Sequence, residues 1–391
     1  MLTLIQNGEL YAPGPLGRKD VLVANNAIEK IGDIDRRALD ALGVEHEVID
    51  ATGCVVTPGL IDPHEHLLGG SGEGSLALQS PMLFIDEICR AGVTTVVGTL
   101  GVDTTMKTLP GLLARVKALE EEGLSTYLWT GGYNVPPTTM LGHVREDMLY
   151  IKECIGVGEV AISDERSLAP TAQELARLVF DCHVGGLLSG KSGITHFHVG
   201  ESDKRLEPLL NLLENFDIKP EWLFPTHVQR TTELMDEAIA FAIEGMPINI
   251  DVVEEDAAKW TRYYLERGGP PEKFTISSDA DSATPDVFYG QFCGLVVKHG
   301  IPLELALRFV TSNTAEILKL EKKGKLEKGC DADILVLTKG SLEIRDVLAK
   351  GTRVVADGSC RARPKFLEES SRNVSLVGDE CDEPVHTTAS A

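Results

Sequence analysis

The sequence predicts an α/β protein: a (β/α)8 TIM barrel with a small β-sandwich domain formed by the N- and C-terminal segments. Two observations support this prediction. Short apolar runs alternate with helix-length amphipathic stretches through the middle of the chain, and β-rich segments of similar texture lie at both ends. The alternation is typical of parallel strands that are each followed by a helix, and we expect the two ends to meet in one domain.

Turn residues separate the short apolar runs at both ends of the chain. Asn-Gly and Asn-Asn pairs bound the first of these runs, as in antiparallel strands. The expected strands cover residues 2–6, 21–23, 27–31, 48–49, 333–337, 344–347 and 353–358. We predict that residues 1–56 and 323–362 together form the β-sandwich domain. Two unrelated hairpins are the alternative.

The central residues 57–322 are expected to form the barrel. Eight apolar runs of strand length lie at 55–61, 94–100, 125–129, 158–162, 194–199, 223–228, 248–252 and 274–278. Amphipathic stretches of helix length between them include 106–121, 172–182, 206–215 and 232–242. An open doubly wound sheet is the alternative, but no G-x-G-x-x-G motif or phosphate-binding loop opens a helix. Residues 363–391 are polar, so we expect a disordered tail there.

The composition excludes several classes of function. Among the 391 residues, Asp and Glu number 60 and Lys and Arg 37, which gives a formal net charge of −23. A surface this negative repels phosphate backbones and anionic lipids, so we expect neither a nucleic acid nor a membrane as partner. The 8 cysteines are scattered and form no C-x-x-C pair, so they predict no disulfide framework. Because the sequence shows no long apolar run and no secretory leader, we expect a cytoplasmic protein.

Histidine and carboxylate side chains recur near the C-terminal ends of the predicted barrel strands, where barrel active sites are built. They are His64, His66, Glu159, His198, His227 and Asp279. Residues two apart in a strand share a face, so His64 and His66 are expected to point together into the barrel mouth. Four imidazoles and two carboxylates form the ligand set of a site for two divalent metal ions, which we expect to be zinc, with Glu159 as the bridge.

Each of these residues has a simpler interpretation when it is considered alone. A single buried histidine is more often a core residue than a ligand, but this many at separate strand ends are hard to obtain by chance. His196 shares a strand face with His198, so we expect it behind a ligand or in the barrel interior. The alternative for Glu159 is a pair with an arginine on the barrel wall.

Longer motifs carry a resemblance to a known superfamily. Residues 56–66, from Val56 to the His64-Glu65-His66 triplet, resemble the opening motif of the amidohydrolase superfamily, and residues 319–336 resemble its closing motif. Within that superfamily the chain most resembles the isoaspartyl (β-aspartyl) dipeptidases, through residues 67–73, 129–136, 161–167 and 224–230. The resemblance implies a metallo-dipeptidase that cleaves the amide bond of β-aspartyl dipeptides by attack of a metal-bridging hydroxide.

The resemblance also implies how the metal ligands divide. His64, His66 and Asp279 would bind one ion, and His198 and His227 the other. Most superfamily members have a carbamylated lysine where this chain has Glu159, which offers the same bridging carboxylate with a shorter reach.

Catalytic and substrate-binding roles follow from the same resemblance. Asp279 would deliver a proton to the leaving amine, and Tyr133 would polarise the scissile carbonyl. Glu73 would bind the α-amino group of the substrate. The other residues that would contact the substrate are Gly70, Ser71, Arg166, Arg230 and Ser282, with the two arginines binding carboxylates. The expected partners are a small zwitterionic peptide and further copies of the chain in a homo-oligomer.

Two departures from the dipeptidase pattern leave another substrate open. Val102 stands where the dipeptidases tend to have a hydroxyl group, and residues 280–283 replace a Gly-Asn-Gly-Ser-like loop. An amidohydrolase acting on another N-acyl or cyclic amide, like the D-aminoacylases or dihydroorotases, is therefore the alternative. A non-catalytic assembly protein on the same scaffold is a third hypothesis, which the full ligand set disfavours.

Overall fold

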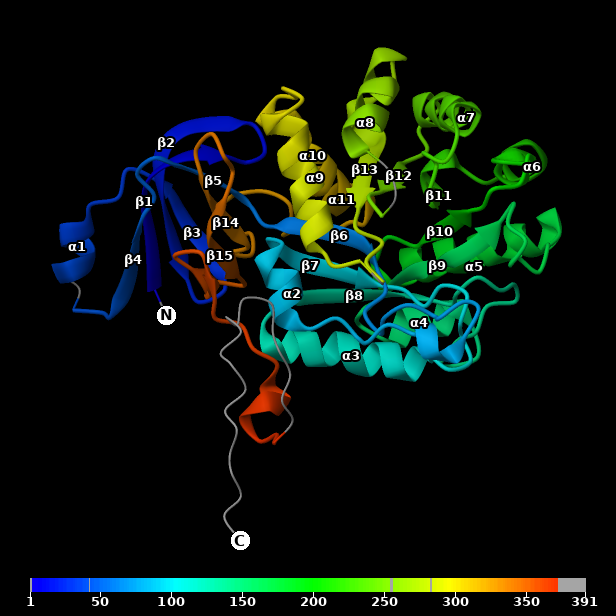
Figure 1. Ribbon diagram of the computed structural model, residues 1–391, viewed down its shortest axis with the longest axis horizontal. Helices are drawn as coiled ribbons and strands as arrows, with labels where there is room; N and C mark the ends of the chain where they lie inside the picture. The colour runs from blue at the N-terminus through cyan, green and yellow to red at the C-terminus, as the bar shows by residue number, and fades with distance from the viewer. Residues whose placement is uncertain (1, 42, 254–255, 282, 372–391) are drawn as a thin grey trace, which may run out of the picture.

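Eight parallel strands dominate the computed structural model, which describes residues 2–41, 43–253, 256–281 and 283–371 (Figure 1). They are β6 (Leu60–Glu65), β7 (Val93–Gly98), β8 (Ser125–Thr130), β9 (Cys154–Ile162), β10 (Ile194–Val199), β11 (Leu223–Thr226), β12 (Ile248–Asp251) and β13 (Phe274–Ser277). Strands β6 to β11 pair in sequence order and β12 pairs with β13. A bridge between Glu65 and Ala280 brings the chain beyond β13 back beside β6. This is a TIM-barrel-like α/β fold, and each of the eight predicted runs overlaps one of its strands.

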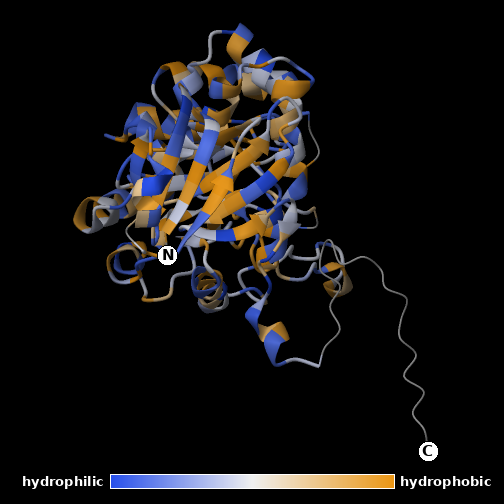
Figure 2. Cartoon of the chain, turned by 90° about the vertical axis from the view of Figure 1, so that its left-hand side faces the viewer, coloured by the Kyte–Doolittle hydropathy of each residue, from blue (hydrophilic) through white to orange (hydrophobic). Residues whose placement is uncertain are grey.

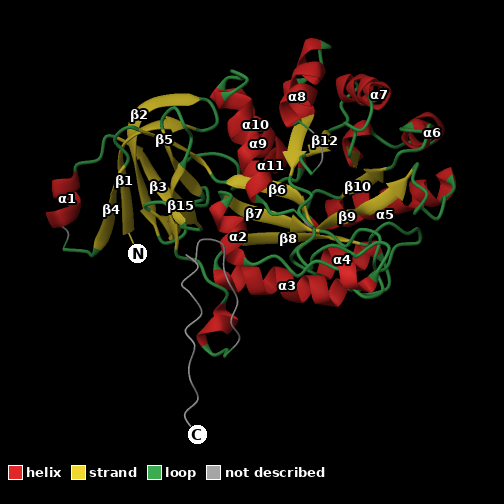
Figure 3. Ribbon diagram, viewed as in Figure 1, coloured by secondary structure: helices red, strands yellow, loops and turns green. Residues whose placement is uncertain are grey.

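Helices follow most of these strands and surround them on the outside (Figure 3). They are α2 (Ile85–Arg90), α3 (Leu109–Glu122), α4 (Val144–Tyr150), α5 (Ala172–Ser189), α6 (Glu207–Asn215), α7 (Thr232–Ile243), α8 (Ala257–Glu266), α9 (Asp286–Val297), α10 (Leu303–Val310) and α11 (Ser312–Ile317). Local signals fix several ends. Thr171 and Glu174 form a capping box at the start of α5, and Gly190 ends that helix in the left-handed conformation. Within the described residues, no helix is both long and apolar enough to cross a membrane.

The barrel strands are buried on both faces. Helix side chains pack against their outer face, and a second apolar cluster that includes Ile61, Trp129 and Phe224 fills the barrel interior. This double burial explains the nearly continuous apolar runs in the sequence. Most buried histidine and carboxylate side chains of these strands, among them Glu159, His198 and Asp251, lie in the carboxyl-terminal half of their strand.

The two ends of the chain meet in one nine-stranded sheet, which faces the viewer in Figure 2. Its strands are β1 (Leu2–Tyr11), β2 (Pro15–Ala24), β3 (Ala27–Gly32), β4 (His46–Asp50), β5 (Cys54–Pro58), β14 (Ile334–Thr338), β15 (Ile344–Ala349), β16 (Thr352–Ala356) and β17 (Ser359–Cys360), and α1 (Arg36–Ala41) lies between β3 and β4. Antiparallel pairing of β5 with β14 joins the two ends. Backbone hydrogen bonds from Ile28 to Cys330 and from Gly329 to Ile28 tie β3 to the segment before β14, so the sheet curls. The strands thus form one curled sheet, and the predicted β-sandwich is not confirmed.

The connection from this sheet to the barrel differs from the prediction in one detail. The apolar run at 55–61 is two strands, with β5 in the sheet and β6 in the barrel. Gly59 lies between them, and a Cβ atom there would be 2.3 Å from Thr94 Oγ1, so only glycine fits. Strand β5 runs to Pro58, two residues past the expected boundary, and the domain boundaries stay predictions.

A buried lysine connects the sheet to the opposite end of the barrel. The Nζ atom of Lys323 lies 2.7 Å from Asp331 and 2.6 Å from Asp333, and it also donates to Ser125 in β8. Within the polar C-terminal segment, a short 3-10 helix covers Lys365–Glu368, and residues 372–391 of the predicted tail lie outside the described residues. Three more single-turn 3-10 helices occur at Leu76–Leu78, Pro220–Trp222 and Pro271–Lys273.

Candidate active site

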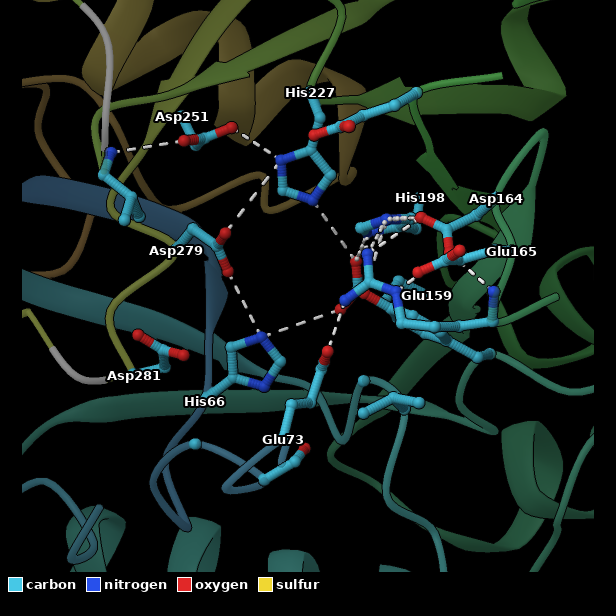
Figure 4. A pocket seen from close by; sticks show the side chains of 18 of the residues that line it. His66, Glu73, Glu159, Asp164, Glu165, His198, His227, Asp251, Asp279 and Asp281 are labelled. Atoms are coloured by element: carbon cyan, nitrogen blue, oxygen red, sulfur yellow. Dashed lines mark hydrogen bonds and ion pairs between the residues drawn. The ribbon is translucent and has the colours of Figure 1, made fainter. Parts of the chain in front are cut away.

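A cavity of about 920 Å³ opens at the carboxyl ends of the barrel strands (Figure 4). Its acidic lining residues are Glu73, Glu159, Asp164, Glu165, Glu201, Asp251, Asp279 and Asp281. Its basic lining residues are Arg166 and Arg230, together with the imidazoles of His66, His198 and His227. Carboxylates outnumber arginines here, so the cavity favours cationic ligands.

The six predicted metal ligands all lie at this cavity or directly beneath it. Their positions follow from the strands. His64, Glu159 and His198 lie within β6, β9 and β10. His66 and His227 directly follow β6 and β11, and Asp279 is the second residue after β13. His227 and Asp279 have the left-handed backbone conformation, with φ values of 62° and 49°. Non-glycine residues in this conformation store about 1–3 kcal/mol of strain and are common at functional sites.

Glu159 lies at the centre of the histidines. Its Oε1 is 3.4 Å from His64 Nε2 and 3.6 Å from His66 Nε2. Its Oε2 is 3.2 Å from His198 Nδ1 and 3.6 Å from His227 Nε2. Burial alone would raise the pKa of Glu159, but His64 and the other histidines hold it well below its ordinary value. The carboxylate thus faces four imidazoles and no arginine in the described contacts, contrary to the barrel-wall alternative.

Asp279 is the second carboxylate that contacts His64 and His66. Its Oδ1 lies 3.2 Å from the Nε2 atoms of both His64 and His66. Burial alone would lower the pKa of His64, yet the charges of Glu159 and Asp279 raise it well above its ordinary value. The carboxylates therefore favour positive charge at this point, which is the electrostatic condition for binding a metal cation.

The hydrogen bonds behind His64 show which nitrogen faces the cavity. His64 Nδ1 lies 2.8 Å from His196 Nε2, and His196 Nδ1 donates to the carbonyl of Phe224 at 2.9 Å. Because His196 uses its own proton for that carbonyl, the Nδ1 proton of His64 donates to His196. His64 Nε2 is buried and forms no hydrogen bond among the described residues, although Asp279 Oδ1 and Glu159 Oε1 lie 3.2 and 3.4 Å from it. An unpartnered imidazole nitrogen beside two carboxylates fits a divalent metal ion.

The donor atoms form three groups of possible metal ligands. Within each group they lie within 4.8 Å of one another: His64, His66 and Asp279; His64, Glu159 and His227; and His227, Asp251 and Asp279. Asp251 is absent from the predicted set. Asp251 is the last residue of the buried strand β12. A carboxylate at the end of an otherwise uncharged four-residue strand was the sequence signal that could have identified it as a site residue. Its Oδ2 lies 2.5 Å from His227 Nδ1. Burial alone would lower the pKa of His227, but the Asp251 charge raises it to about 9.

Tyr133 lies on the other side of the cluster. Its hydroxyl is 2.9 Å from His198 Nδ1. Burial raises the pKa of Tyr133 well above its ordinary value, so the phenol keeps its proton at neutral pH and can donate a hydrogen bond. Asp164 is a second site residue that the sequence analysis did not predict. Its carboxylate lies 3.0 Å from His198 Nε2 and accepts two hydrogen bonds of 2.8 Å from the Arg166 guanidinium.

The structure places the predicted substrate residues around the same cavity. Arg166 forms a 2.8 Å ion pair with Glu73, and both side chains are partly exposed. Arg230 donates to the carbonyl of Val199 at 3.0 Å and lies 3.2 Å from Glu201.

The remaining predicted substrate contacts are Gly70 and Ser71, on the loop after β6, and Ser282. Gly70 and Ser71 line the cavity, and a Cβ atom at Gly70 would be 2.9 Å from Asp281 Oδ2. Val102 also lines the cavity. Ser282 lies outside the described residues, so its predicted contact stays a prediction.

Known proteins are similar to this chain in fold and in sequence. The chain is 38% identical to a β-aspartyl dipeptidase of Fervidobacterium islandicum, with a TM-score of 0.88 over 92% of this chain and 99% of that one. The structure of that dipeptidase with β-Asp-Leu gives 37% identity and a TM-score of 0.86, over 92% and 98% of the two chains. A dihydroorotase of Lactobacillus delbrueckii subsp. bulgaricus is 24% identical over 86% of this chain and 89% of its own length. Residues 272–362 also match the amidohydrolase family model. The chain therefore belongs to the amidohydrolase superfamily and, within it, is related to the β-aspartyl dipeptidases.

Proposed function

We propose that this protein is a binuclear metal-dependent hydrolase that cleaves the amide bond of β-aspartyl dipeptides. The observation that carries the proposal is Glu159, whose two carboxylate oxygens face two different pairs of histidines in one cavity. The 38% identity to a β-aspartyl dipeptidase supports the substrate class.

The donor set supports two divalent ions, which we propose to be zinc. His64, His66 and Asp279 would bind one, as one of the three groups above. His198 belongs to none of those groups, but it faces the same Glu159 oxygen as His227, so His198 and His227 would bind the other ion and Glu159 would bridge the two. Imidazole nitrogens with a few carboxylate oxygens are the ligands that zinc prefers in hydrolases. Two such ions lower the pKa of a shared water molecule toward neutrality and so supply a nucleophile.

Asp279 and Tyr133 are the proposed catalytic residues. Asp279 lies against two histidines and is part of the cavity wall, so it can accept a proton during attack and pass it to the leaving amine. Tyr133 keeps its phenolic proton and can donate a hydrogen bond to the scissile carbonyl as negative charge develops there.

Charged side chains at the cavity wall would recognise a zwitterionic substrate. Glu73 would bind the α-amino group, and Arg166 and Arg230 would bind carboxylates. The Glu73–Arg166 ion pair places the two opposite charges 2.8 Å apart, so a substrate that inserts between them would exchange this contact for one of its own with each side chain. Gly70, Ser71 and Ser282 stay proposed substrate contacts, and the cytoplasmic location and homo-oligomer stay predictions from the sequence.

A second candidate function is hydrolysis of a cyclic amide. Val102 supports it, because this apolar side chain lines the cavity where the dipeptidases tend to have a hydroxyl. The similarity to a dihydroorotase supports the same candidate.

A hydrolysis screen of the zinc-loaded protein separates these candidates. The substrates are β-Asp-Leu, α-Asp-Leu, an N-acyl-D-amino acid and dihydroorotate. We expect β-Asp-Leu to have the highest kcat/KM. Turnover of dihydroorotate with none of β-Asp-Leu would contradict the proposed function and favour the second candidate.

A further inference from the structure

Two histidines of the cluster are supported from behind by chemically different groups. His64 donates to His196, a neutral imidazole that is itself tied to a backbone carbonyl. His227 contacts Asp251, a carboxylate. The two supports lie on opposite sides of Glu159 in the cluster, so each acts on a different part of the proposed metal site.

The contact between His227 and Asp251 has the geometry of a hydrogen bond. Two atoms bound to one zinc ion at about 2 Å in tetrahedral geometry lie about 3.3 Å apart. The separation of His227 Nδ1 from Asp251 Oδ2 is 2.5 Å, which is too short for a shared ion. Asp251 therefore accepts the Nδ1 proton of His227, which leaves Nε2, 3.6 Å from Glu159 Oε2, as the nitrogen that would bind a metal ion.

Asp251 is itself held in a fixed orientation. Gln229 Nε2 donates to the same Oδ2 at 2.5 Å, and the backbone N–H of Val253 donates to Oδ1 at 3.2 Å. Asp251 and His227 are both buried, at 5% and 4% exposure. A buried carboxylate fixed by three donors keeps its charge directed at His227 and limits rotation of the ring.

We propose that Asp251 is a positioning residue that strengthens one of the two metal positions, the one bound by His198 and His227. This inference rests on the proposed function. A carboxylate behind a ligating histidine fixes the tautomer and makes the free nitrogen a better donor, and its loss typically weakens metal binding 10- to 100-fold. His196, which supports His64, is a neutral imidazole. The effect of a charge behind a ligand is therefore expected only at the metal position that Asp251 supports through His227.

The test compares Asp251→Asn with the wild type and with Asp147→Asn. Asparagine keeps the shape of the side chain and can still accept a hydrogen bond, so the change removes the charge. Asp147 is an equally buried carboxylate that accepts from Thr130 Oγ1 and from the backbone of Met140 and Leu141, and none of these residues is a proposed metal ligand. Zinc affinity is measured by competition with a chromogenic chelator, and the melting temperature Tm is measured with and without zinc.

In Asp251→Asn we expect one zinc equivalent to bind 10- to 100-fold more weakly, the other to be unchanged, and the rise in Tm on zinc binding to shrink. Asp147→Asn should keep both affinities, whatever its Tm. Unchanged affinity for both equivalents in Asp251→Asn would overturn the inference. The inference would also be overturned if Asp251→Asn lowered Tm by the same amount with and without zinc and left the zinc affinity unchanged, because that result indicates a structural role alone. A wild type that binds no zinc would contradict the proposed function instead.

Discussion

Replacing Glu159 by glutamine removes one negative charge from the centre of the histidine cluster and leaves the shape of the side chain nearly unchanged. Glu159 is 1% exposed, and four imidazole nitrogens lie within 3.2 to 3.6 Å of its two oxygens. Removing one partner from a buried ionic arrangement costs about 3–5 kcal/mol. Since about 1.4 kcal/mol is a tenfold change, metal affinity should fall by roughly 10² to 10⁴.

The assay is elemental analysis of the desalted protein after zinc loading, with hydrolysis of β-Asp-Leu measured on the same samples. Glu153→Gln is the matched control, because Glu153 is a buried glutamate just before β9 that pairs with Lys117 at 2.6 Å and lies outside the cavity. The control should lose stability and keep its zinc. Near-normal zinc content and activity in Glu159→Gln would refute the bridging role of Glu159.

Glu159 also predicts how the protein responds to carbon dioxide. A site completed by glutamate needs no carbamylated lysine, so recovery of activity after metal removal should be the same with and without added bicarbonate. In Glu159→Lys, bicarbonate should partly restore activity if the cavity accommodates the longer side chain. Dependence of the wild type on bicarbonate would contradict this reasoning.

Three further predictions test other parts of the account. Tyr133→Phe should lower kcat about 10²- to 10³-fold with little change in KM, because it removes a hydrogen-bond donor to the developing charge; unchanged kcat would exclude that role. N-acetylation or C-terminal amidation of β-Asp-Leu removes one of the substrate charges that Glu73, Arg166 and Arg230 would pair with, so kcat/KM should fall more than tenfold, and equal turnover would reject the recognition scheme. Burial alone would lower the pKa of Lys323, but the charges of Asp333 and Asp331 raise it above the ordinary 10.5. The stability that the charged lysine adds should therefore be complete below pH 10.5 and be lost as the pH rises through the higher pKa of the folded protein. Urea unfolding at pH 8 and pH 11 should show this loss of stability in the wild type and a much smaller loss in Lys323→Met.

The eight barrel strands could be predicted because each is a short apolar run bounded by turns or helices. Burial on both faces makes such runs stand out in the sequence. The pairing of β5 with β14 was harder to specify, because its hydrogen bonds join segments from opposite ends of the chain. The curl of the terminal sheet depends on contacts such as Ile28 with Cys330, which no local pattern encodes.

The positions of the predicted metal ligands followed from the rule that barrel sites lie at the carboxyl ends of strands. The residues that contact the predicted ligands from behind could not be predicted from this rule. Asp251 lies at the end of a four-residue strand that carries no histidine, and its partner His227 directly follows the neighbouring strand β11. Asp164 and Arg166 are two residues apart, yet their pairing with His198 and Glu73 requires the folded loops. Hydrogen bonds between strand ends depend on how the folded chain arranges the strands, and sequence spacing does not reveal them.

Titration of the metal-free protein with Zn²⁺, followed by hydrolysis of β-Asp-Leu, tests the central claim most directly. The account predicts almost no activity without metal and a rise that ends at two equivalents per chain. Full activity at one equivalent would contradict the binuclear site, and full activity without metal would contradict metal-dependent hydrolysis altogether.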